Sequence, residues 1–96
     1  MTHELNNSSF SPTPEAAASF HDDGIVILHT SKGRLFSSNR TGAQIWRGIE
    51  QQLPVELIFQ QLSDQYQIAL NSAREHTIGF LAQLQQHQLV RQEARQ

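Results

Sequence analysis

The chain has 96 residues, a formal net charge of -2 at pH 7, 38% hydrophobic residues and 17% charged residues. These values fit one small folded domain and argue against wholesale disorder, and the lack of a basic excess argues against a nucleic-acid binder. The chain has no cysteine, which excludes disulfides, thiolate metal sites and a cysteine nucleophile. It has neither an apolar run near the roughly 20 residues of a membrane span nor a secretory signal, so we expect a cytoplasmic protein with no membrane partner.

The two ends of the chain are polar. Residues 1–14 are rich in Asn, Ser and Thr and carry prolines at positions 12 and 14, so we expect a flexible N-terminal arm. An arm that is swapped onto a neighbouring copy is the alternative. Residues 91–96 are expected to form a flexible tail. The folded domain is therefore expected over residues 15–90.

Three strands are expected at the start of this domain. Ala16 to His21 is the first, although its three alanines would suit a helix equally well. The following Asp-Gly sequence favours a tight hairpin, and Ile25 to His29 is a strongly β-branched run. A second turn ends at Gly33, and Arg34 to Ser38 returns as the third strand. Two tight turns around one strong strand predict a three-stranded antiparallel meander.

Two helices are expected next, because apolar residues recur at helical spacing. The first runs from Arg40 to Glu50, with Ser38 or Asn39 as its N-cap, and it includes the only tryptophan. The second runs from Pro54 to Tyr66, since proline suits a first helical position. Ile68, in the connector that follows, is expected to plug the core.

The third helix is expected to begin at Asn71 or Ser72, with Glu75 closing a capping box if Ser72 is the cap. Its apolar face comprises Ala73, Thr77, Phe80, Leu81 and Leu84, and the apolar pair Leu89 and Val90 follows the helix. The order of three strands and then three helices predicts an α+β domain of the winged helix-turn-helix type.

The sequence offers no arrangement of residues for catalysis. The five histidines, at positions 3, 21, 29, 76 and 87, include no pair at the i, i+4 spacing of a helical metal site. Asp22 and Asp23 are adjacent, so on a strand they would point to opposite faces. No nucleophile elbow, phosphate loop or dinucleotide fingerprint is present. We therefore expect a protein that is not an enzyme and holds no cofactor or metal.

An interaction surface is the better expectation. If Arg34 to Ser38 is the edge of the sheet, its outer amide and carbonyl groups are unpaired, and an extended peptide can add there as another strand. Ile78 borders the apolar face of the last helix and either lines a groove beside this edge or simply widens the core. The expected peptide-binding residues are Arg34, Leu35, Phe36, Ser37 and Ser38 on the strand, and Arg74, Ile78, Leu81 and Gln85 on the helix.

The local charge indicates the ligand's character. Between positions 24 and 49 the chain carries Lys32, Arg34, Arg40 and Arg47 and no acid, which favours an acidic peptide. The alternative function is a small winged-helix transcriptional regulator with its last helix in the major groove. That helix, at 71–88, carries only Arg74 as a permanent cation, so release of counterions would contribute little affinity for DNA. An open strand edge also permits a homodimer.

The segment from Gly33 to Trp46, with Asn39, Thr41, Gly42, Ile45 and Trp46, resembles the strand-to-helix segment of the PqqD-like proteins, the peptide chaperones of pyrroloquinoline quinone (PQQ) biosynthesis. Leu53 to Tyr66 and the run Ile78 to Leu84, followed by Leu89 and Val90, are similar to the family's later helices. Two positions depart from the family pattern. His76 stands where an acid is common, and Gln88 stands where glycine is common.

The resemblance implies a recognition element for ribosomally synthesised and post-translationally modified peptides (RiPPs). Such an element holds the leader segment of a precursor peptide as an added strand beside the third helix. The implied partners are the precursor peptide and a modifying enzyme, such as a radical S-adenosylmethionine enzyme or a lasso-peptide leader peptidase. PQQ biosynthesis, a lasso-peptide system and another modifying pathway all remain open.

Overall fold

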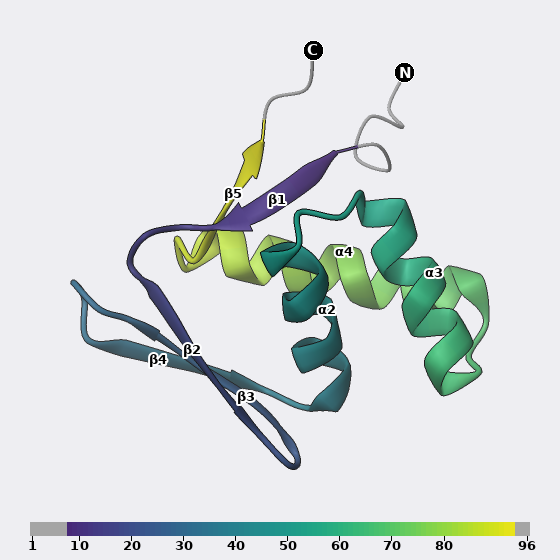
Figure 1. Cartoon of the computed structure of the whole chain (residues 1–96), viewed down its shortest axis with the longest axis horizontal. Coiled ribbons are helices and arrows are strands. Elements are labelled where there is room, and N and C mark those ends of the chain that lie inside the picture. Colours follow the sequence, from purple (N-terminus) through teal and green to yellow (C-terminus); the bar gives the residue numbers. More distant parts are fainter. Residues whose placement is uncertain (1–7, 94–96) are drawn as a thin grey trace.

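The computed structural model describes residues 8–93. Its elements follow in the order β1 (Ser9–Pro12), β2 (Ala16–His21), β3 (Gly24–His29), β4 (Arg34–Ser38), α2 (Arg40–Glu50), α3 (Val55–Tyr66), α4 (Leu70–Gln86) and β5 (Val90–Glu93). Strands β2, β3 and β4 form one antiparallel sheet in that order, and β1 pairs with β5 in a separate two-stranded sheet (Figure 1). The predicted α+β arrangement of a meander followed by three helices is confirmed.

Burial along the central strand β3 shows which face of the sheet packs against the helices. Ile25 and Ile27 are 1% and 0% exposed on the inner face, while Val26 and Leu28 are half-buried on the other face. Each fully buried isoleucine contributes about 1.5–3 kcal/mol to folding relative to an exposed one. The β-branched run that predicted the strand therefore also supplies its share of the core.

Helix α2 is fixed at both of its ends. At the start, Asn39 Oδ1 accepts a hydrogen bond from Gly42 N at 3.1 Å, so Asn39 is the N-cap and Ser38 is not. Near the end, Trp46 is 1% exposed and its Nε1 donates to Glu50 Oε2 at 2.9 Å. The indole thus has both an apolar environment and a hydrogen-bond acceptor, as a buried tryptophan requires.

The start of α4 differs from expectation. The helix begins at Leu70 with Ala69 as its N-cap, so the predicted caps Asn71 and Ser72 are wrong and no side chain caps this helix. Ile68 packs against the core, as predicted, and its carbonyl accepts from Ser63 Oγ at 2.7 Å. Because the connector is tight, α4 begins directly after Ala69. The predicted core face of α4 is buried, as are Leu89 and Val90.

The expectation of a flexible arm and tail is wrong for the parts that the structure describes. β1 pairs antiparallel with β5, with Ser9 opposite Glu93 and Pro12 opposite Val90. Phe10 is 1% exposed and belongs to the core. The folded unit therefore reaches from Ser8 to Glu93 and exceeds the predicted 15–90, whereas residues 1–7 and 94–96 lie outside the described residues.

Polar contacts join the two terminal strands. The Ser11 hydroxyl donates to a carboxylate oxygen of Glu93, and Arg91 Nε lies 3.4 Å from the same oxygen. The hydrogen bond from Ser11 outweighs partial desolvation and, together with Arg91, lowers the pKa of Glu93 below its usual value of 4.5. The ionised carboxylate is thus the form that the β1–β5 pairing favours.

Candidate functional site

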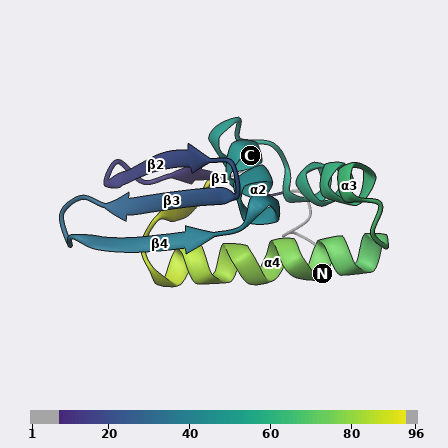
Figure 2. The ribbon, with the colours of Figure 1, turned by 90° about the horizontal axis from the view of Figure 1, so that it is seen from below.

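The open edge of the sheet lies beside the last helix. In the described part of the chain no strand pairs with the outer side of β4, because the sheet order ends there. Figure 2 shows β4 as the strand of the sheet nearest α4. We call the surface between this edge and α4 the groove; its helical side carries His76, Gly79, Phe80, Gln83 and His87.

The register of the sheet determines which backbone groups of β3 face β4. A two-residue turn joins β2 to β3, so His21 and Gly24 form the closing hydrogen-bonded pair. Hydrogen-bonded pairs recur at every second residue of an antiparallel ladder. The backbone groups of β3 that point toward β4 are therefore those of Ile25, Ile27 and His29.

The same alternation identifies the free groups of β4. The residues opposite Ile25, Ile27 and His29 are Ser38, Phe36 and Arg34, whose backbone groups point back toward β3. The amide and carbonyl groups of Leu35 and Ser37 must then point to the open edge. They form a short row of donors and acceptors that an extended peptide can complete.

An aromatic contact joins the two sides of the groove. The Phe36 ring centroid lies 5.7 Å from that of Phe80 and 5.2 Å from that of His87, both in edge-on geometry. Phe36 is half-buried and packs against the core, whereas Leu35 on the opposite face of β4 is 70% exposed. The Phe36 side chain therefore holds β4 against α4 and leaves the backbone edge accessible.

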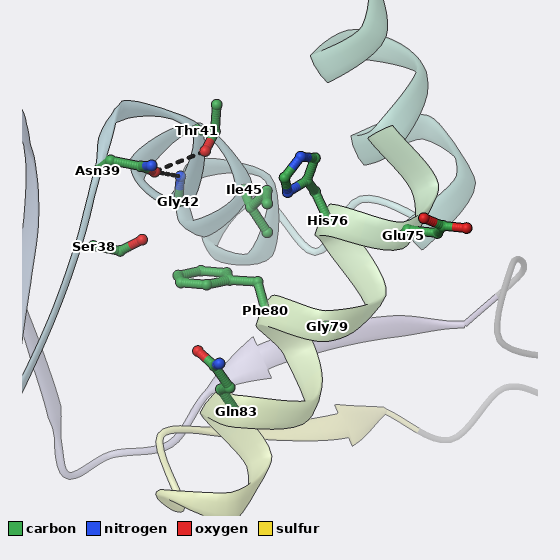
Figure 3. A pocket seen from close by; sticks show the side chains of 10 residues that line it. All are labelled: Ser38, Asn39, Thr41, Gly42, Ile45, Glu75, His76, Gly79, Phe80 and Gln83. Atoms are coloured by element: carbon green, nitrogen blue, oxygen red, sulfur yellow. Dashed lines mark hydrogen bonds between the residues drawn. The ribbon is translucent and has the colours of Figure 1, made fainter. Parts of the chain in front are cut away.

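A cavity of about 300 Å³ occupies one end of the groove, where β4 turns into α2 (Figure 3). The Phe80 ring points from α4 toward Ser38 and Gly42, and Glu75 points away from them. Asn39 Oδ1 already accepts from Gly42 N and from Thr41 Oγ1 at 2.7 Å, so these polar groups serve the helix cap. Ile45 and Phe80 are apolar and His76 and Gln83 are polar, a combination that suits a side chain of a bound peptide.

Two glycines that line this cavity are expected to respond in opposite ways to alanine. A Cβ at Gly42 would lie 2.2 Å from Ser38 Oγ and 3.1 Å from a Phe80 ring carbon, whereas a Cβ at Gly79 meets nothing within 4 Å. Gly42→Ala should lower the free energy of unfolding by about 1–3 kcal/mol through overpacking. Gly79→Ala should raise it by about 1 kcal/mol, because alanine favours the helix. Chemical denaturation of both variants measures this, and equal shifts would contradict the assigned packing.

The structure places the predicted strand residues at the groove but not the predicted helix residues. Leu81 is 2% exposed and belongs to the core. Ile78 lies two positions from Phe80, a rotation of about 200° around the helix. Arg74, Ile78 and Gln85 therefore lie on the other border of the buried stripe, and they line neither groove cavity. The predicted helical side of the site is corrected accordingly.

Sequence reasoning missed His76, Gly79, Gln83 and His87 because both borders of the α4 stripe are polar. The single apolar border residue, Ile78, drew the prediction to the wrong side. One signal in the sequence could have indicated the correct border, namely Gly79. An isolated glycine inside a helix lowers stability, which suggests a close approach or an open surface at that position.

Only part of the predicted basic cluster faces the groove. Arg40 Nε donates to the Asp22 carbonyl at 2.9 Å, and the Arg47 guanidinium lies 4.0 Å from the centroid of the Phe20 ring. Lys32 and Arg34 line the end of the groove opposite the α2 helix. The positive charge available to a ligand is therefore concentrated at that end.

Two features are absent from residues 8–93. None of their helices combines the length and hydropathy of a membrane span. No three of their histidine, aspartate and glutamate side chains gather as a metal site would require.

A comparison with known proteins relates this chain to a known family. Residues 24–90 match the family model described as coenzyme PQQ synthesis protein D (PqqD). The chain belongs to the PqqD family. This finding confirms the resemblance carried by the strand-to-helix segment, and the match includes β3, β4, α2, α3 and α4. A comparison with curated proteins finds no match.

Two solved structures share the fold of this PqqD-family chain. One is TbiB1 in complex with the TbiA(beta) leader peptide, with a TM-score of 0.79 and 22% identity; the match covers 88% of this chain and 99% of that chain. The other is lasso peptide synthetase B1 complexed with the leader peptide, with a TM-score of 0.78 and 20% identity over 86% and 98% of the two chains. The likeness extends beyond the family match to nearly the whole described fold.

Proposed function

We propose that this PqqD-family protein binds the leader segment of a ribosomally synthesised precursor peptide as an added β-strand. The observation that carries the proposal is the open edge of β4, where the backbone groups of Leu35 and Ser37 point outward beside the groove. Both solved structures described above hold a leader peptide, which supports the proposal.

The chemistry of the groove suits recognition without catalysis. Backbone hydrogen bonds to β4 supply affinity for any extended chain, and the cavities on either side of Phe36 supply selectivity for particular side chains. The proposed binding residues are Arg34, Leu35, Phe36, Ser37 and Ser38 on β4, and His76, Gly79, Phe80, Gln83 and His87 on the helical side.

The protein then presents its bound peptide to a separate modifying enzyme. A radical S-adenosylmethionine enzyme and a leader peptidase are the two partner classes that the family resemblance implies. The pathway is PQQ biosynthesis, lasso-peptide biosynthesis or another RiPP system, and the genes encoded beside this one would distinguish them.

Titration with synthetic peptides tests the proposal. Fluorescently labelled peptides covering the leader segments of neighbouring short precursors should bind with micromolar affinity, and scrambled peptides should not. In an NMR titration the backbone amide signals of Leu35 and Ser37 should shift among the most. Failure of every leader peptide to bind would reject the proposal, and a strongly salt-dependent mobility shift of promoter DNA would favour the regulator instead.

A further inference from the structure

A second cavity lies at the other end of the groove, where the turn between β3 and β4 meets the end of α4. Its volume is about 30 Å³. One water molecule needs about 10–15 Å³, so this space suits a group of about carboxylate size. Its polar lining includes His29, Lys32, Arg34 and His87. We call it the turn cavity.

A buried histidine lines this cavity, and its hydrogen bond defines its tautomer. His29 is only 6% exposed, and the backbone N–H of Lys32 donates a hydrogen bond to its Nδ1 at 3.2 Å. A backbone amide can only donate, so Nδ1 is the acceptor and the proton of the neutral ring is on Nε2. Within residues 8–93 no hydrogen bond from Nε2 is formed. His29 is one of the residues that line the cavity.

The cations at the turn cavity lack an acidic partner. Lys32 Nζ donates to the neutral side-chain oxygen of Gln88. The Arg34 side chain is exposed and forms no hydrogen bond or ion pair within residues 8–93, in which Arg91–Glu93 is the single ion pair. Among residues 8–93, no aspartate or glutamate lines the cavity. The set of groups is thus rich in donors and positive charge.

We propose that the turn cavity binds a side-chain carboxylate of the leader peptide, an aspartate or a glutamate, through Arg34 and Lys32. A carboxylate has only acceptors, and charge-assisted hydrogen bonds to guanidinium or ammonium groups are the strong ones. The proposal rests on strand addition at β4, which carries the peptide past Arg34. Alternate side chains of an added strand point toward α4, so one suitably placed acid reaches the cavity.

The test uses a leader peptide that binds in the titration above, synthesised with an amidated C-terminus. Each aspartate or glutamate of the peptide is replaced in turn by asparagine or glutamine. The protein variants are Arg34→Gln and, as a matched control, Arg74→Gln, which removes an exposed cation from the side of α4 away from the groove. Thermal melts establish that both variants fold.

One peptide substitution is expected to raise Kd about tenfold, and Arg34→Gln is expected to raise Kd for the parent peptide by a similar factor. The two changes together should add little beyond either alone, because they remove the same contact. Arg74→Gln should leave Kd within about twofold.

Two results would overturn the inference. In the first, Arg34→Gln and every acid substitution leave Kd within about twofold while the parent peptide still binds; strand addition would then stand without a carboxylate site. In the second, affinity appears only when the peptide's own C-terminal carboxylate is free. Absence of binding by any leader peptide is a different outcome, because it rejects the proposed function itself.

Discussion

Replacing Ser37 by proline is expected to weaken leader-peptide binding at least about tenfold while the domain stays folded. The amide of Ser37 points to the open edge of β4, so proline removes a donor that the added strand needs and places its ring in the strand's path. No hydrogen bond of the β3–β4 ladder is lost, and Phe36 already has the extended conformation that a following proline requires. We expect Kd to rise at least about tenfold and the free energy of unfolding to fall by less than about 1 kcal/mol.

Ser37→Ala is the matched control for this variant. It removes the exposed hydroxyl and keeps the backbone amide, so peptide affinity should stay within about twofold of the parent protein. Isothermal titration and thermal denaturation on the three proteins separate binding from folding. Equal affinity of Ser37→Pro and Ser37→Ala would show that the peptide does not add to β4 as a strand.

Phe10→Ala is expected to destabilise the whole domain. Phe10 is 1% exposed in the core, although it lies in a segment whose composition predicted a flexible arm. Truncation of a buried phenylalanine leaves a cavity and costs about 3–5 kcal/mol, a large share of the about 5–15 kcal/mol that holds a domain together. The melting temperature should fall by more than about 10 °C.

Leu57→Ala provides the comparison, because Leu57 is 38% exposed on α3. Its truncation should cost less than about 1 kcal/mol. Urea titrations of the two variants give the free energies directly. If Phe10→Ala is no less stable than Leu57→Ala, β1 does not contribute to the core as the structure indicates.

The terminal strands show why composition alone misjudged the ends of the chain. Serines at positions 8, 9 and 11 surround Phe10, and all three are buried in the structure. Serine carries no apolar signal in a sequence. Its burial depends on partners far along the chain, such as Gln92, whose Nε2 donates to Ser8 Oγ at 2.8 Å. A strand pairing between residues 78 to 84 positions apart leaves little trace in any local pattern.

The helical side of the groove shows a second feature that a local sequence pattern does not determine. The sequence correctly predicted which residues of α4 enter the core, because burial follows the helical period. Which border of that stripe faces β4 depends on the direction in which α4 crosses the sheet, and periodicity does not contain this information. Only the contact of Phe80 with Phe36 identifies the border that carries His76, Gln83 and His87.

The sequence by itself determined the meander, the three helices, the bounds of β4 and of α2, and the family, because each depends on neighbours in the chain: turn residues, helical spacing and a strand-to-helix motif. The tertiary structure decided what those elements bring together. It placed Lys32 and Arg34 beside His29 and His87. It brought Arg40 into contact with Asp22 and Arg47 into contact with Phe20. It also paired β1 with β5, near the two ends of the chain, in one sheet. Such juxtapositions arise from packing between distant segments, which no local pattern specifies.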